Sequence, residues 1–278
     1  MINPFKALDD LIRVNIVHRK QTLSMAGNAL KKQYGGTAMG WGWAVFHAAF
    51  YILMYWFGIV VGIRGSRFVT LNDGREIPFI IWFLPGIIGW FLFRDVLSKG
   101  VSCIRKESHL VNKIVFPIET IPVFTVLSYT ITHVSILGIV FLIYVFTGQP
   151  ITIYFLQLLY YIPLFFIFCC FVCTLISTIA VISRDFEQLV KSVTIAFFWF
   201  TPVLWDLSKL DKRPFVQLIM KANPYYYFIQ GYRETFMGQA WFWEHKYHTL
   251  YFWGVLLVLA LFTAVLQKKL QPEFADVI

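Results

Sequence analysis

Charged residues are scarce in this sequence of 278 residues, since Asp, Glu, Lys and Arg together make up only 14%. Soluble domains carry about 25%. Hydrophobic residues reach 58% and aromatic residues 19%, far more than a soluble core of this length needs. A chain with so few charges cannot surround such an apolar interior with a hydrated surface. The composition therefore excludes an ordinary soluble domain and predicts an all-α polytopic membrane protein.

Motifs for nucleotide hydrolysis and hydrolytic catalysis are also absent. The chain has no G-x-x-x-x-G-K-[ST] phosphate loop, no H-E-x-x-H and no G-x-S-x-G. The apolar runs have almost no Asp or Glu at their centres, where many ion-driven carriers hold a coupling ion. We expect no catalytic residue in this chain, so a transporter of this kind would need a separate motor subunit.

Cysteine is limited to Cys103, Cys169, Cys170 and Cys173. These residues lie at a cytoplasmic edge and inside one apolar run, which is unlike the disulfide framework of a secreted domain. No His or carboxylate stands near the group of three. We interpret them as small packing residues and expect neither a metal site nor a cofactor in this chain.

Six apolar runs are candidates for transmembrane helices, and they cover residues 41–63, 77–93, 120–146, 151–182, 185–205 and 247–266. The first run contains no charged residue, and as a helix it rises about 35 Å, enough to cross a hydrocarbon core of about 30 Å. The fifth run begins with charged residues near Asp185, which would lie at the interface or in a wet cavity. We predict six spans within a membrane domain of residues 41–278.

The distribution of positive charge predicts the orientation. With the N-terminus inside, 15 of the 24 Lys and Arg residues fall on the cytoplasmic side. The positive-inside rule then places both termini in the cytoplasm of a multi-pass cell-membrane protein. The net charge of +9 is thus a topology signal, and because the basic residues form no single patch, we expect no nucleic-acid partner.

The first 40 residues contain no cleavable signal peptide. Phe5, Leu8, Ile12 and Ile16 follow helical spacing between charged residues, which is typical of an N-terminal amphipathic segment lying flat at the headgroup boundary of membrane lipids. A cytoplasmic helix that packs on a partner fits the pattern equally well.

The segment of residues 206–246, between the fifth and sixth runs, is long and aromatic. Asn223-Pro224 breaks the chain, and residues 225–236 predict a helix of about 18 Å, too short to span. We expect re-entrant or interfacial outer helices, with Arg233 and Glu234 at headgroup depth. The alternative is a seventh, imperfect span, which would move the C-terminus outside.

The polar strip from Glu107 to Pro117 separates the second and third runs. Its pattern places Leu110 and Ile114 on one helical face, with charged residues around them. A short amphipathic helix on the inner membrane face would offer a docking element to another protein. A solvated loop whose lysines only set topology is the alternative.

The stretches "IPFIIWFLPG", "HLVNKIVFP", "SRDFEQ", "TPVLWD" and "NPYYYFIQGYRETF" occur in an order and spacing that resemble the membrane subunits of ABC-2 type exporters, most specifically the permeases for wall teichoic acid. The resemblance covers nearly the whole chain. It implies six spans per subunit and a complex of two permease copies with two separate ATP-binding subunits, which would carry the ATP and Mg.

The resemblance also implies roles for particular residues. The strip after the second span would be the ATPase-coupling helix, made of Glu107, Ser108, His109, Leu110, Val111, Asn112, Lys113 and Ile114. The re-entrant hairpin would be the outer gate, with Tyr225, Tyr226, Tyr227, Arg233 and Glu234, although interfacial anchoring explains the tyrosines equally well.

A translocation path is a hypothesis built on the facing first and fifth spans of two copies. Its candidate residues are Trp41, Trp43, Phe197, Phe198, Trp199 and Phe200, with Arg184 and Asp185 at the start of the fifth span. Packing against lipid is the alternative for the rings. An N-terminal cap against the helix dipole is the alternative for the charged pair.

These observations together predict a permease subunit, not an enzyme, that exports wall teichoic acid linked to polyprenyl diphosphate, in a Gram-positive bacterium. An exporter of O-antigen or capsular polysaccharide is the nearest alternative. A membrane-embedded glycosyl- or phosphotransferase acting on polyprenyl lipids is the alternative from another class, and it would need clustered carboxylates, whereas Glu107, Asp185 and Glu187 are scattered in the sequence.

Overall fold

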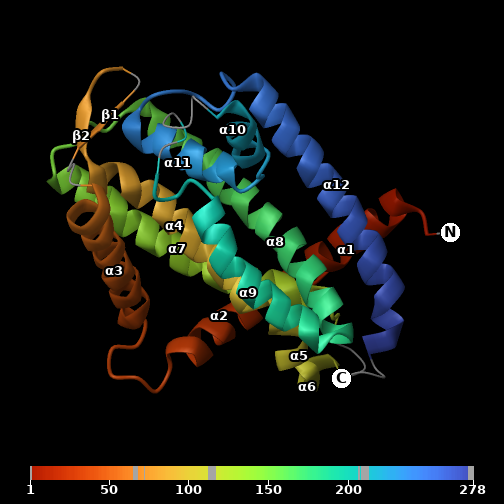
Figure 1. Ribbon diagram of the computed structural model, residues 1–278. Coiled ribbons are helices and arrows are strands. Elements are labelled where there is room, and N and C mark those ends of the chain that lie inside the picture. The colour runs from red at the N-terminus through yellow and green to blue at the C-terminus, as the bar shows by residue number, and fades with distance from the viewer. Residues whose placement is uncertain are drawn as a thin grey trace.

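The computed structural model describes residues 2–64, 68–71, 73–111, 117–205, 207 and 213–274, which are almost entirely helical. Figure 1 shows the long helices gathered in one bundle, with the β-hairpin, α10 and α11 in its upper part and α5 and α6 at its lower end. The long helices are α3 (Gly42–Phe57), α4 (Phe79–Ser98), α7 (Thr120–Phe146), α8 (Leu158–Ile182), α9 (Arg184–Phe200) and α12 (Lys246–Leu270).

Five helical stretches are long and apolar enough to cross a membrane, and they coincide with five of the six predicted spans. They cover Gly42–Gly62, Phe79–Lys106, Thr120–Phe146, Ile153–Ile182 and Lys246–Glu273. The first stretch continues α3 with a π-helical turn, η1 (Gly58–Arg64), and the fourth begins with a 3-10 turn, η3 (Ile153–Gln157).

The predicted fifth span, residues 185–205, forms the shorter helix α9. It has 17 residues and ends at Phe200. A helix of this length rises only about 25 Å, and its first two turns carry charged side chains. The segment predicted as the fifth span therefore forms a short amphipathic helix beside the five long apolar stretches.

The second span is longer than the sequence predicted. The predicted apolar run ends at Phe93. In the structure, α4 continues to Ser98 and is followed by η2 (Gly100–Ser102) and α5 (Cys103–Lys106). Apolar residues between the charges, such as Val96 and Ile104, are fully buried and keep one face of the stretch inside the protein. The second helical stretch therefore extends to Lys106, beyond the predicted end of its apolar run.

The core is centred on α4, which is apolar on every side and buried along most of its length. It packs between α7, α8 and the short helix α11 (Tyr226–Met237), of which all but Gln230 is buried. By contrast, α3 and α12 expose large apolar side chains, including Phe50, Phe57 and Leu257. Such faces suit a hydrocarbon environment or a partner.

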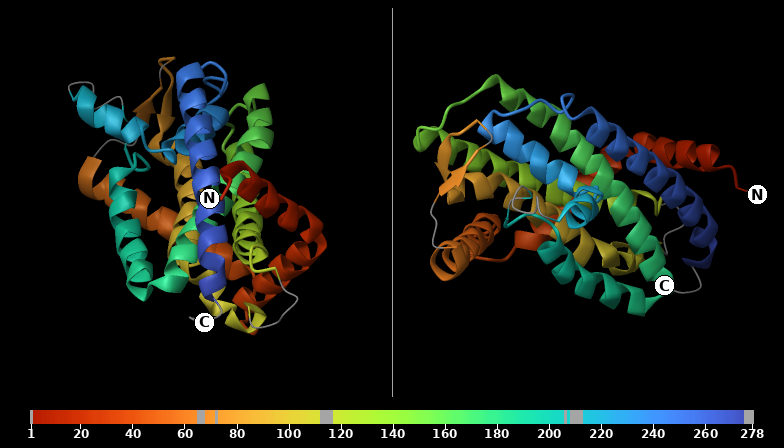
Figure 2. Two further views of the ribbon diagram at one scale, coloured as in Figure 1. Left: turned by 90° about the vertical axis from the view of Figure 1, so that its right-hand side faces the viewer. Right: turned by 45° about the horizontal axis from the view of Figure 1, so that its top comes forward.

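The N-terminal region forms two helices, α1 (Pro4–Val17) and α2 (Arg19–Tyr34). Ala7 and Leu11 of α1 are buried in one small cluster with Ala264 of α12, and Figure 2 shows α1 crossing α12. The opposite face of α1 exposes Phe5, Ile12 and Ile16 together with the charged residues Asp9 and Arg13. Helix α1 thus packs on the bundle and exposes an amphipathic face.

A β-hairpin that the sequence did not predict joins the first span to the second. Strands β1 (Phe68–Thr70) and β2 (Glu76–Pro78) pair antiparallel. The turn uses Gly74 at φ 83°, a conformation that favours glycine. Arg75 donates a hydrogen bond of 2.7 Å from Nη2 to the carbonyl of Met237, which fastens the hairpin to the end of α11.

Candidate functional site

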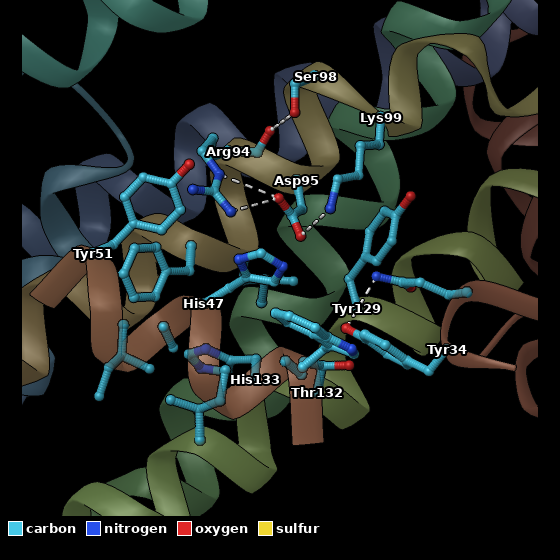
Figure 3. A pocket seen from close by; sticks show the side chains of 18 of the residues that line it. Tyr34, His47, Tyr51, Arg94, Asp95, Ser98, Lys99, Tyr129, Thr132 and His133 are labelled. Atoms are coloured by element: carbon cyan, nitrogen blue, oxygen red, sulfur yellow. Dashed lines mark hydrogen bonds and ion pairs between the residues drawn. The ribbon is translucent and has the colours of Figure 1, made fainter. Parts of the chain in front are cut away.

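A pocket of about 780 Å³ lies between α2, α3, α4 and α7. Each helix contributes polar or aromatic side chains, and Figure 3 shows them directed into one space. A volume of this size is typical of small-molecule sites, which span about 300–1,000 Å³. The polar residues that line it are Gln33, Tyr34, Thr37, His47, Tyr51, Arg94, Asp95, Ser98, Lys99, Tyr129, Thr132 and His133.

Three charged side chains of α4 and its end form the polar wall of the pocket. Oδ1 of Asp95 accepts hydrogen bonds from Nε and Nη2 of Arg94 at 3.2 and 3.0 Å, and Oδ2 accepts one from Nζ of Lys99 at 3.0 Å. Asp95 is the only carboxylate among the described lining residues. Because two cations share one anion, this wall has an uncompensated positive charge.

Aromatic rings lie on both sides of this charged group. The Arg94 guanidinium carbon is 5.3 Å from the ring centroid of Tyr51, and Lys99 Nζ is 5.8 Å from that of Tyr129. Both distances suit cation–π attraction. Figure 3 shows Tyr51 on the Arg94 side of Asp95, and Tyr34 and Tyr129 on the Lys99 side. Burial raises the pKa of Tyr34, so its hydroxyl stays protonated and can donate a hydrogen bond.

His47 and Trp43 of α3 form the opposite wall. Their ring centroids are 5.4 Å apart. His47 is largely exposed to the pocket and its surroundings, and Trp43 is half-buried. The pocket therefore combines positive charge, hydroxyl donors and flat aromatic surfaces, a combination that suits an anionic, sugar-bearing ligand.

His133 connects the pocket to α11. Its Nε2 lies 2.9 Å from the hydroxyl of Tyr232, and the two rings stack with centroids 5.7 Å apart. His133 is 3% exposed and is therefore a packed, hydrogen-bonded side chain. It also gives the pocket a direct contact with the predicted outer hairpin.

The predicted coupling segment is described only in part. Ser108–Val111 form the single turn α6, whereas Asn112, Lys113 and Ile114 lie outside the described residues. The predicted apolar face of Leu110 and Ile114 therefore stays a prediction. Glu107 lies 3.7 Å from Nζ of Lys32 in α2 and 3.6 Å from Nε2 of His109. Since Lys32 is next to Gln33 and Tyr34, the segment contacts the helix that forms one wall of the pocket.

Arg105 is a residue whose role the sequence did not indicate. Its Nη1 donates to Oε2 of Glu187 at 2.8 Å, and its Nη2 donates to the carbonyls of Ala180 and Val181 near the end of α8. These contacts join α5 to the α8–α9 junction. The side chain thus ties the end of the second helical stretch to the junction between α8 and α9.

The residues predicted for the translocation path do not form one group. Trp43 lines the pocket, whereas Phe197 and Phe198 pack in the core against Trp90, with centroids 6.3 and 4.9 Å away. The remaining five residues are exposed and are not among the described pocket residues; they are Trp41, Trp199, Phe200, Arg184 and Asp185. Helix α9 is capped by Ser183, whose side chain accepts from the amide of Phe186.

The predicted gate residues are inside the protein. Tyr225, Tyr226 and Tyr227 are at most 7% exposed. Arg233 lies 3.6 Å above the ring centroid of Trp82 and donates to the carbonyls of Pro202 and Val203 at 2.9 and 2.5 Å. These contacts hold the guanidinium inside the protein, and its depth relative to the headgroups stays a prediction.

Glu234 is also inside, at 5% exposure. It accepts hydrogen bonds from Gln230 at 2.7 Å and lies 2.9 Å from Nε2 of His245. This contact raises the pKa of His245 and favours its protonated form. Glu234 thus joins a half-buried side chain, Gln230, to the exposed side chain of His245, and its depth relative to the headgroups stays a prediction.

Metal ligands are not gathered in the part of the chain that the structure describes, where no group of three His, Cys, Asp or Glu residues could hold an ion. Cys103, Cys169 and Cys173 are buried, and Sγ of Cys103 lies 4.0 Å from that of Cys173. Their surroundings agree with a packing role.

The sequence analysis did not identify the charged wall, because Arg94, Asp95 and Lys99 follow the end of the predicted apolar run at Phe93. A signal was present: apolar residues continue between and beyond these charges at helical spacing. Ionisable residues within such a helix are rare and typically functional.

Comparisons with known proteins relate most of the chain to one transporter family. Residues 20–237 match the ABC-2 type transporter family. The O-antigen export system permease protein RfbA of Myxococcus xanthus is 24% identical over 246 residues, which cover 85% of each chain. The polysialic acid transport protein KpsM of Escherichia coli is 23% identical over 210 residues, which cover 75% of this chain and 78% of the relative.

Proposed function

The chain belongs to the ABC-2 type transporter family, and on that premise we propose that it is the permease subunit of an exporter for a lipid-linked polysaccharide. The observation that carries the proposal is the family match over residues 20–237, together with relatives named for O-antigen export and polysialic acid transport. Both names specify a long hydrophilic glycan as the cargo. The apolar helices agree with a place in the cell membrane.

Such a cargo has two parts with opposite needs. Its lipid anchor favours hydrocarbon, whereas each polar group of its glycan costs about 2–7 kcal/mol if it enters an apolar medium without a hydrogen-bond partner. An exporter must therefore offer polar groups inside the membrane. The pocket with Arg94, Lys99 and several hydroxyls is the kind of surface that this transport requires.

The polymer itself is the finer part of the proposal. The sequence resemblance favours wall teichoic acid on polyprenyl diphosphate, in the cell membrane of a Gram-positive bacterium. The relatives support O-antigen or capsular polysaccharide equally well. The uncompensated positive charge beside Asp95 agrees with a phosphate-rich polymer.

The energy source is proposed to be ATP hydrolysis on a separate ATP-binding subunit, which holds the ATP and Mg. Residues 107–114 would dock on it, and Glu107 would transmit movement to α2 through Lys32. Both termini would be cytoplasmic. An exposed ion pair contributes only about 0–1 kcal/mol to stability. The Glu107–Lys32 pair would therefore matter as a contact between the coupling segment and α2, more than as a source of stability.

A second copy of the chain would complete the path. Helices α3 and α9 both carry exposed apolar and aromatic side chains, including Phe50, Trp199 and Phe200. Figure 2 shows the two helices along the same side of the molecule. Closure of the motor would change access to the space between the copies, and α11 would act as the outer gate.

The test is reconstitution of the permease with its ATP-binding subunit in proteoliposomes. Lipid-linked teichoic acid, O-antigen and capsular polysaccharide are supplied separately, and ATPase stimulation and protected glycan are measured. We expect one polymer to stimulate hydrolysis and to be transported only with ATP. The proposal fails if none is transported, or if the permease alone transports the glycolipid without nucleotide.

The rival membrane transferase predicts a covalent product. Incubation of the purified chain with polyprenyl-linked sugar donors, followed by mass spectrometry, would detect a transferred sugar or phosphate. We expect the donor to be recovered unchanged. A transfer product would replace the transport proposal.

A further inference from the structure

The pocket between α2, α3, α4 and α7 has a charge arrangement that the family assignment does not explain. Arg94 and Lys99 share the single carboxylate of Asp95, although all three belong to a helical stretch that carries no charge from Phe79 to Phe93. Charges in such a stretch are costly unless they are paired or serve a ligand. Asp95 neutralises one of the two cations, so a second anion is needed for balance.

Hydrogen-bonding capacity remains on both cations. Among the described residues, Asp95 accepts hydrogen bonds from Nε and Nη2 of Arg94 and one hydrogen bond from Nζ of Lys99. The Nη1 group of Arg94 and further protons of Lys99 are available to a ligand. Phosphate oxygens suit these donors, because guanidinium and ammonium groups bind them through short charge-assisted hydrogen bonds.

The size and the other walls of the pocket indicate more than a free anion. Its volume of about 780 Å³ leaves room beside a phosphate group. Trp43 and Tyr51 present aromatic surface, and Tyr34 and Thr132 present hydroxyl groups. These side chains suit the first sugar attached to the phosphate.

We propose that this pocket binds the diphosphate headgroup of the lipid-linked polymer, with Arg94 and Lys99 as its counter-charges and Asp95 as the residue that positions both. The inference rests on the proposed export function and identifies where the cargo is first held. The Lys32–Glu107 contact links this site to the coupling segment through α2, so the motor can act on the wall that closes over the headgroup.

The first experiment measures binding of farnesyl diphosphate to the purified permease–ATPase complex in lipid nanodiscs. Replacing Arg94→Gln or Lys99→Gln should weaken binding about tenfold or more, since each removes a charge-assisted contact. Asp95→Asn should instead tighten binding, because it removes the competing anion. Lys106→Gln is the matched control: it removes an exposed positive charge from the same stretch outside the pocket, and binding should not change.

The opposite direction of Asp95→Asn separates the proposal from simple misfolding, which would weaken binding in every variant. Equal binding of farnesol would overturn it, because the site would then recognise only the apolar chain. Inorganic diphosphate or phosphatidylglycerol that competes as well as farnesyl diphosphate would also overturn it, as it would indicate a free-anion or bulk-lipid site.

Transport by the same complex distinguishes this inference from the proposed function. If Arg94→Gln exports lipid-linked polymer at the unmodified rate, the headgroup site is refuted while the exporter stands. If the unmodified complex binds farnesyl diphosphate but exports no polymer, the site stands and the proposed function fails.

Discussion

Arg105 at the end of the second span binds Glu187 in the first turn of α9, with Nη1 and Oε2 2.8 Å apart. The pair joins segments that lie 82 positions apart in the sequence. Glu187 also accepts from Nζ of Lys191 at 2.7 Å. Helix α9 is thereby held to α5 at the end of the molecule where the coupling segment lies.

The first prediction concerns this pair. Glu187→Gln should lower the free energy of unfolding by about 1.5–3 kcal/mol, because Arg105 would lose its charged partner while remaining half-buried. Denaturant titration in mixed micelles measures the change. Glu273→Gln, which alters an exposed carboxylate, is the control. Equal stability of the two variants would contradict a structural role for the pair.

Close helix packing gives the second prediction. A methyl group at Gly231 of α11 would overlap the ring of Tyr161 in α8. Gly231→Ala should destabilise the protein by about 1–3 kcal/mol, as overpacked cores do. Gly138→Ala, at a helical site with free space, should cost nothing or stabilise by up to about 1 kcal/mol. A smaller residue at position 161 should rescue the first variant, and failure of the rescue would refute this contact.

The third prediction tests Arg233, which binds two carbonyls and stacks on Trp82. Arg233→Lys keeps the charge but loses the planar fork, so it cannot make all three contacts. We expect a loss of about 2–4 kcal/mol in unfolding free energy. The exposed Arg213→Lys change should be neutral. If both lysine variants behave alike, charge alone explains Arg233.

His245 provides the fourth prediction, on pH. Its hydrogen bond with Glu234 raises its pKa above the ordinary value of about 6.5. The stabilisation is therefore fully present below about pH 6.5 and is lost as the pH rises through the raised pKa. The melting temperature should exceed that of His245→Gln more at pH 5.5 than at pH 8.5, and Glu234→Gln should remove this pH dependence. If the difference in melting temperature between the two proteins instead grows as the pH rises, the prediction is contradicted.

The fifth prediction concerns topology and docking. If α9 crosses the membrane, a reporter fused after Ile278 should be cytoplasmic, whereas an external signal would indicate an odd number of crossings.

In the same cells, replacing Leu110 and Ile114 by Asp should release the ATP-binding subunit in detergent pull-downs. Co-purification of an intact complex would refute docking through this segment.

Local sequence features were sufficient for much of the fold. Five predicted spans coincide with helices of sufficient length, and the predicted helix at residues 225–236 is α11 within one residue. Cys103, Cys169 and Cys173 are buried, which agrees with their interpretation as packing residues. These features depend on the length and composition of continuous segments, which a single sequence displays directly.

The polar site was not predictable in the same way. Arg94 and Lys99 follow the apolar run that ends at Phe93, so the sequence indicates only cytoplasmic charges that set the topology. Arg233 was assigned to the interface because an isolated charge near aromatic residues usually lies there. In the structure, its partners Trp82, Pro202 and Val203 come from other segments. Such partners become known only when the helices are packed.

The sequence by itself determined that this chain is an integral membrane protein of several helices without a nucleotide-binding motif, because apolar length and missing motifs are local properties. Only the tertiary structure decided which charged side chains are buried, that Asp95 accepts hydrogen bonds from both Arg94 and Lys99, and that α11 lies in the core. The physical reason is that burial and ion pairing depend on which helix faces meet, and contacts between distant residues determine those faces.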